Sequence, residues 1–138
     1  MAKKTKSISK LKKELDKWFS LYIRLRDATS EGMVQCFTSG RVYHYKKIHA
    51  GHFMSRRYLA TRYCAMNVQP QSPKDNLFGQ GEQYLFGLKL DAKYGEGCSE
   101  ELQYKARQTV KITRPEYEDE ISYYKKAVEN LKKEKGIE

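Results

Sequence analysis

The sequence has no long apolar run, few prolines, and cysteines without the spacing of a disulfide framework. Its 138 residues include only 3 Pro and 3 Cys, and no apolar run approaches the roughly 18 residues that a membrane-spanning helix requires. Cys36, Cys64 and Cys98 are an odd number without tight spacing, which favours reduced thiols. The lysine-rich segment Met1–Lys13 leads into an amphipathic stretch, which is not typical of a secretory signal. We therefore expect a cytoplasmic protein with one domain over residues 1–138, a length that suits a single core.

Acidic residues are absent from one long segment of the chain, Gly32 to Lys74. Residues 1–74 carry 16 Lys and Arg against 4 Asp and Glu, whereas residues 75–138 carry 11 against 13, so the net charge of +10 belongs to the first half. A field of this sign attracts polyanions, most commonly nucleic acid, although a solvated basic face has the same composition. The candidate contacts to DNA are Arg41, Lys46, Lys47, Arg56, Arg57, Arg62 and Lys74.

Apolar spacing predicts helices at both ends of the chain. Steps of four and three residues predict a helix over about residues 9–28, with a face formed by Leu11, Leu15, Trp18, Tyr22 and Leu25. Ser99 followed by two glutamates predicts the first of the C-terminal helices, which together cover residues 99–135. The last of these opens with a capping box and a proline at Thr113–Glu116. Its face consists of Tyr117, Ile121, Tyr124, Val128 and Leu131. These stripes predict core packing, with a homodimer interface as the alternative.

The middle of the chain, residues 34–93, has mixed patterning. The β-branched and aromatic segments 34–37 and 41–53, separated by the turn signal Thr38-Ser39-Gly40, predict a hairpin. Residues 54–81 are punctuated by proline and glycine and predict a loop. Helical patterning resumes over 83–93, where the apolar residues are Tyr84, Leu85, Leu88 and Ala92. The fold class that follows is α+β.

Two of the three histidines lie in the stretch His49-Ala50-Gly51-His52-Phe53, which is followed by Arg56 and Arg57. A bare His-x-x-His on a strand is more often structural, with both rings bonded to backbone carbonyls. However, a hairpin ending in histidine, then a loop containing Asn67, then Asn76 ahead of a helix is the order of parts in a ββα-metal, or His-Me finger, nuclease. This order alone is a weak signal of a functional site, and the choice between the two readings depends on the flanking segments.

Further segments occur in an order that carries a resemblance along nearly the whole chain. They are Asp16–Asp27 (Asp-Lys-Trp-Phe-Ser-Leu-Tyr-Ile-Arg-Leu-Arg-Asp), His49–Phe53, Thr61-Arg62, Asn67-Val68, Gln71, Asn76, Tyr94-Gly95 and Thr113-Arg114. In this order they resemble the phage NinG family, also called the lambda Rap recombination endonucleases. The pentapeptide His-Ala-Gly-His-Phe is the most specific of the matches.

The resemblance implies roles in phosphodiester hydrolysis for several of these residues. His52 would be the general base, because histidine titrates near neutral pH, and Asn67 would accept a hydrogen bond from its ring or orient it. A catalytic Mg²⁺ or Mn²⁺ would be held by a nitrogen of His49 and an oxygen of Asn76. Asp75 is a further candidate metal ligand, and the arginines after the motif would hold flanking phosphates.

The chain departs from the family at its cysteines. Relatives carry two Cys-x-x-Cys pairs for a structural zinc, whereas here the corresponding segments are Cys36–Ser39 and Ser72–Asp75. A serine hydroxyl is not deprotonated at neutral pH and cannot replace a thiolate on zinc. We therefore expect no structural zinc. The loop would be held instead by hydrogen bonds among Ser39, Ser72 and Asp75, or by packing of Phe37 and Phe78.

The function implied by the resemblance is metal-dependent endonuclease action on branched recombination intermediates, namely Holliday junctions and D-loops. Resolution of a junction by paired nicks favours a homodimer. Two alternatives stay open on the sequence. One is a non-catalytic protein with the same fold that binds branched DNA, and the other is a basic RNA-binding protein.

Overall fold

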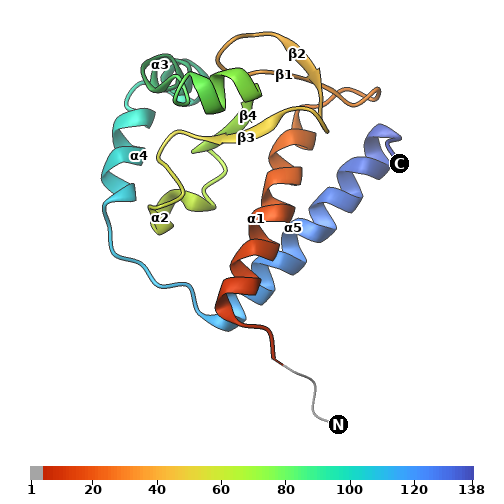
Figure 1. The fold of residues 1–138 in the computed structure, drawn as a ribbon, viewed down its shortest axis with the longest axis vertical. Coiled ribbons are helices and arrows are strands. Elements are labelled where there is room, and N and C mark those ends of the chain that lie inside the picture. The colour runs from red at the N-terminus through yellow and green to blue at the C-terminus, as the bar shows by residue number, and fades with distance from the viewer. Residues whose placement is uncertain (1–4) are drawn as a thin grey trace.

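Two long helices from opposite ends of the chain lie side by side in the computed structural model, which describes residues 5–138 (Figure 1). Helix α1 (Ile8–Arg26) begins after Ser7, whose side chain accepts a hydrogen bond from the amide of Lys10. Helix α5 (Arg114–Lys135) begins with the predicted capping box between Thr113 and Glu116. Both terminal helices are thus confirmed. The first four residues of the lysine-rich N-terminal segment lie outside the described part of the chain.

The apolar faces of α1 and α5 cover each other. Phe19 is buried at their contact, and its ring meets that of Tyr124 edge-on with centroids 5.0 Å apart. The face of α1 is rotated slightly from the prediction, because Phe19 and Ile23 are fully buried while Trp18 and Tyr22 are only partly buried. The stripes therefore form core, as expected. The buried residues of this cluster are Leu11, Leu15, Phe19, Ile23, Val68, Tyr117, Ile121 and Tyr124.

The predicted hairpin is present but shorter than expected. Strand β1 (Met33–Gln35) pairs with β2 (Val42–His44), and the chain then turns through residues 45–48. Tyr45 and Ile48 are both buried by this turn, and the amide of Tyr45 donates to the carbonyl of Gly32. The histidine stretch therefore lies on a separate strand, β3 (His49–His52), and its predicted place at the end of the hairpin's second strand is wrong.

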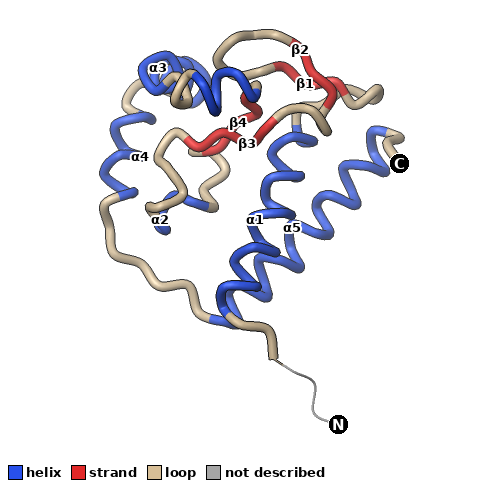
Figure 2. The backbone as a smooth tube through the Cα atoms, in the orientation of Figure 1, coloured by secondary structure: helices blue, strands red, loops and turns tan. Residues whose placement is uncertain are grey.

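The partner of β3 lies in the segment predicted as loop. Residues 54–81 contain helix α2 (Leu59–Arg62), strand β4 (Val68–Gln71) and the π-helical turn η1 (Lys74–Phe78). β4 pairs with β3 antiparallel, with His49 opposite Gln71 and His52 opposite Val68, and Figure 2 shows this second strand pair beside the first. Pro70 lacks a donor, but its carbonyl accepts from the amide of Phe37 at 2.7 Å, so it links the two strand pairs.

Helices α3 (Gln83–Tyr94) and α4 (Cys98–Ala106) form a second layer around Phe53. α3 occupies the predicted residues but faces the opposite way, since Phe86, Gly87 and Leu90 are buried while Tyr84 is exposed. α4 begins one residue before the predicted start at Ser99, and Ser99 donates to Asp91 instead of capping the helix. Among residues 5–138, the helices are all too short or too polar to cross a bilayer.

Gly51 allows strands β3 and β4 to approach each other closely. A Cβ at this position would lie 2.2 Å from Oε1 and 2.8 Å from Cβ of Gln71. We expect Gly51→Ala to lower the free energy of unfolding by about 1–3 kcal/mol, the usual cost of overpacking a closed core. Urea denaturation measures this loss. Gly87→Ala is the matched control, because its new Cβ would meet side chains no closer than 3.3 Å. An equal or smaller loss for Gly51→Ala would contradict the close approach.

Candidate active site

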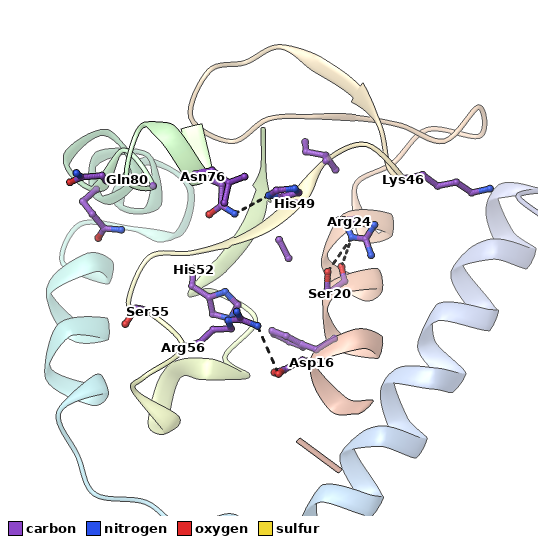
Figure 3. A pocket seen from close by; sticks show the side chains of 16 residues that line it. Asp16, Ser20, Arg24, Lys46, His49, His52, Ser55, Arg56, Asn76 and Gln80 are labelled. Atoms are coloured by element: carbon purple, nitrogen blue, oxygen red, sulfur yellow. Dashed lines mark hydrogen bonds and ion pairs between the residues drawn. The ribbon is translucent and has the colours of Figure 1, made fainter. Parts of the chain in front are cut away.

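A cleft of about 750 Å³ lies between α1, β3 and η1. Figure 3 shows α1 on one side of it, the histidine strand along its floor, and Asn76 and Gln80 on the opposite side. Both histidines of the pentapeptide line this cleft, His49 near η1 and His52 near α1. The polar residues of the lining are Asp16, Ser20, Arg24, Lys46, His49, His52, Ser55, Arg56, Asn76, Gln80 and Gln83.

His52 is held in one tautomer by the backbone. Its Nε2 lies 3.0 Å from the carbonyl oxygen of Arg62, and because a carbonyl can only accept, Nε2 carries the hydrogen. Burial and the positive charges of Arg56 and Arg62 lower the pKa of His52 to about 4, although the Arg62 carbonyl and Asp16 act in the opposite sense. The ring is therefore neutral at pH 7. Its Nδ1 keeps an unprotonated lone pair that no hydrogen bond within residues 5–138 uses.

Asn67 holds the loop after β3 rather than the ring of His52. The amide is fully buried; its Oδ1 accepts from the backbone of Met54 at 2.8 Å, and its Nδ2 donates to the carbonyls of Met54 and Thr61. The predicted direct contact between Asn67 and His52 is therefore wrong. The role of Asn67 is one step removed, since it fixes the segment whose Arg62 carbonyl holds the imidazole.

Asp16 on α1 pairs with Arg62. The carboxylate accepts two hydrogen bonds from the guanidinium and a third, at 2.8 Å, from the hydroxyl of Tyr63. Burial alone would raise the pKa of Asp16, but these partners, with the charge of Arg56, lower it below its ordinary value. The side chain of Arg62 is only 13% exposed. The predicted phosphate contact by Arg62 does not fit this placement, whereas Arg56, 62% exposed, is open to the cleft.

His49 and Asn76 meet across the cleft. Nδ1 of His49 lies 3.0 Å from the side-chain nitrogen of Asn76, which donates to it. Rotation of the amide by 180° would bring its oxygen to the same place. Nδ1 of His49 and the amide oxygen of Asn76 would then both be available to bind a cation placed between them. Neighbouring ligands in an octahedral shell with bonds of about 2.1 Å are about 3 Å apart, so the pair fits two positions on Mg²⁺ or Mn²⁺.

Asp75 turns away from this pair. Its Oδ2 accepts from the hydroxyl of Thr38 at 2.6 Å, so the prediction that Asp75 is a ligand of the catalytic metal is wrong. Across residues 5–138, no three His, Cys, Asp or Glu side chains are grouped so as to hold a metal ion. A cation at His49 and Asn76 would therefore keep most of its ligands as water, as Mg²⁺ commonly does.

The segments Cys36–Ser39 and Ser72–Asp75 are joined by hydrogen bonds around Cys36. Its sulfur accepts from the amides of Ser39 at 3.4 Å and Ser72 at 3.2 Å, and Ser72 Oγ accepts from the amide of Asp75. Burial would raise the pKa of this thiol, but hydrogen bonds from Ser39, Ser72 and Thr38 lower it to about 7. The predicted hydrogen bonding is thus found in part: Asp75 and Ser72 are bonded directly, whereas Ser39 and Ser72 are joined through the sulfur of Cys36. The predicted packing by Phe37 is also present, since its ring lies 5.2 Å from that of Phe86. Phe78 does not contribute packing, because it is 84% exposed.

The other predicted DNA contacts lie at or beyond the edges of the cleft. Lys46 lines the cleft. The other side chains do not line it but are exposed, and they are Arg41, Lys47, Arg57 and Lys74. Arg24 lines the cleft but was not predicted from the sequence. Its guanidinium donates to the side chain and carbonyl of Ser20 and to the carbonyl of Tyr45. Asp16, Ser20 and Arg24 recur every four residues along α1. Polar residues with that spacing beside an apolar stripe are the signal that could have identified this wall of the cleft.

A family model described as the bacteriophage lambda NinG protein matches residues 1–134. Searches of curated proteins and of solved structures give no match.

The buried ring of His52 predicts a specific loss of stability in acid. Its pKa is about 4 in the folded protein and near the ordinary 6.5 when unfolded. Between these values the unfolded chain binds a proton that the folded protein does not, so the free energy of unfolding falls as pH decreases from 6.5 to 4. In the wild type the free energy of unfolding falls between pH 7.5 and 4.5, and His52→Gln should make this fall smaller by about 2–3 kcal/mol, as measured by urea denaturation at the two pH values. Parallel pH profiles for wild type and His52→Gln would contradict the prediction.

Proposed function

Since the chain belongs to the NinG family, which implies a phage protein related to recombination, we propose that it is a metal-dependent endonuclease. Its substrates would be branched recombination intermediates, namely Holliday junctions and D-loops. The observation that carries the proposal is the shared cleft. The cleft contains His52, a neutral histidine with one free nitrogen, and the pair of His49 and Asn76, whose spacing fits a cation. Lys46 and Arg56 line the same cleft.

His52 supports this proposal as the general base. Hydrolysis of a phosphodiester requires removal of a proton from the attacking water. The hydrogen on Nε2 is committed to Arg62, so Nδ1 is the atom that takes this proton. The resulting imidazolium would be stabilised by the carbonyl of Arg62 and the nearby carboxylate of Asp16, the two groups that raise the ring's pKa. An approaching phosphate would act in the same direction.

His49 and Asn76 would hold a Mg²⁺ or Mn²⁺ ion. When bound, such an ion supplies positive charge that stabilises the phosphorane and the leaving oxygen. The two residues come from separate elements, the start of β3 and the middle of η1, and the pairing of His49 with Gln71 on β4 fixes the strand. The succession of β3, β4, η1 and α3 is consistent with a ββα-metal core, and this correspondence is part of the proposal.

The charge of the cleft supports a nucleic-acid substrate. Its only carboxylate lining, within the described residues, is Asp16, which is paired with Arg62. Asp16 also lies 4.0 Å from Arg56. A phosphate that enters therefore meets Arg24 and Lys46, which have no carboxylate partner among the described residues, and an exposed Arg56 that shares Asp16 with Arg62. Arg24 is already oriented by three hydrogen bonds, which lowers the entropy lost when it contacts an anion.

The decisive test is Mg²⁺- or Mn²⁺-dependent cleavage of a labelled four-way junction by wild type, His52→Gln and His44→Gln. We expect His52→Gln to lower the cleavage rate at least a hundredfold, within the usual contribution of a general base, and to bind the junction as wild type does. His44→Gln is matched in chemistry but lies outside the cleft lining, and it should cleave normally.

Other results would select the alternatives. Junction binding without cleavage in either cation would favour a non-catalytic DNA-binding protein. Tighter binding to RNA than to the junction, again without cleavage, would favour an RNA-binding protein. Equal cleavage by wild type and His52→Gln would refute the role of His52 as base.

A further inference from the structure

Five large apolar side chains from two neighbouring segments of the chain are exposed at one edge of the cleft. They belong to η1 and the first turns of α3, and we refer to them as the apolar rim. Phe78 and Tyr84 are the most exposed large apolar side chains in the described chain, at 84% and 83%. The rim consists of Leu77, Phe78, Tyr84, Leu85 and Leu88. It includes the residues that periodicity assigned to the buried face of α3, so their exposure is not explained by packing.

The apolar rim is continuous with the wall of the cleft. Leu77 lines the cleft and precedes Phe78, and Gln83 lines the cleft and precedes Tyr84. Each aromatic residue thus follows directly on a residue that faces the candidate active site. Figure 3 places the turn between them, at Gln80, on the side of the cleft opposite α1.

The turn between the two aromatic residues is held in an unusual conformation. Gln80 and Glu82 have φ of 53° and 48°, in the left-handed region that side chains other than glycine rarely adopt. Hydrogen bonds maintain it: the amide of Gly81 donates to Asp75 at 2.8 Å, and the carbonyl of Gly81 accepts from Gln71 at 2.8 Å. Strain of this kind persists only where surrounding contacts determine the backbone, so both rings are presented from a fixed support.

The chemistry around the rim indicates which partner would cover it. Lys74 lies on η1 itself, and Lys46 and Arg56 line the same cleft, so the rim adjoins a surface that attracts phosphate. Exposed aromatic rings beside a basic groove are the arrangement by which proteins stack nucleobases. Bases in a continuous duplex already have neighbours on both faces. Only bases at a break in the stack, such as a branch point, offer a free face to a ring.

We propose that Phe78 and Tyr84 stack on unpaired or unstacked bases at a DNA branch point, and that this contact produces the preference for branched over continuous DNA. The inference rests on the proposed function, because the branch point must then lie beside the cleft that cuts it. It adds a recognition element for bases to a site whose other residues are proposed to act on phosphate, water and a cation.

The test measures binding without divalent cations, so that no cleavage occurs. Wild type and the Phe78→Ala/Tyr84→Ala double variant are titrated onto a four-way junction carrying 2-aminopurine at the branch point and onto a linear duplex of equal length. We expect the double variant to bind the junction at least tenfold more weakly, to lose the stacking-induced change in 2-aminopurine fluorescence, and to bind duplex within twofold of wild type. Tyr104→Ala is the control, because Tyr104 is 72% exposed on α4 and does not line the cleft.

Three outcomes would overturn the inference. They are unchanged junction binding, an equal loss of affinity for junction and duplex, and a wild-type dimer in sedimentation that the double variant dissociates, since the rim would then bind a second copy.

The outcome of this binding comparison is independent of catalysis. Failure of wild type to cleave any junction would refute the proposed nuclease while leaving the binding comparison intact, and the binding comparison can fail while cleavage through His52 persists.

Discussion

The ion pair between Asp16 and Arg62 joins helix α1 to the segment that fixes His52, the candidate general base. Arg62 acts through two parts at once: its guanidinium is bonded to Asp16, and its carbonyl is bonded to His52. Asn67 secures the same segment from the other side through the backbone of Met54 and Thr61. Helix α1, whose opposite face packs on α5, thereby sets the position of an imidazole that lies more than twenty-five residues further along the chain. Loss of any one of these contacts would disturb the others.

The parts of the fold that could be predicted from sequence are those with local signals. Helical spacing and the Thr113–Glu116 capping box identify α1 and α5, and Thr38–Gly40 identifies the first hairpin. β4 could not be predicted, because two of its four buried residues are glutamines, which are usually exposed, and because Pro70 is typical of a loop. The reversed face of α3 has a similar cause. Its apolar residues fall on both sides of the helix, and only tertiary contacts with Phe53 decide which side is buried.

The residues of the candidate site divide in the same way, into those with a local sequence signal and those whose role depends on tertiary contacts. Two histidines and a later asparagine can be selected from the sequence, and the structure brings both histidines and Asn76 to one cleft. What sequence could not give is which atoms are already engaged. Arg62 and Asp75 have the right chemistry for phosphate and metal, yet each is bonded to a residue about forty positions away. Partners at that separation in sequence leave no local pattern, so such assignments depend on the folded geometry.

The half-buried guanidinium of Arg24 has a thermodynamic consequence. It donates only to neutral oxygens, and no carboxylate within residues 5–138 lies close enough to form an ion pair with it. Burial lowers its pKa, a sign that removal of this charge from water is incompletely compensated. An anion that binds in the cleft would restore the missing interaction and would do so only in the folded state. Folding and anion binding would then be linked equilibria, and the apparent stability of the protein would depend on whether its buffer contains sulfate, phosphate or chloride.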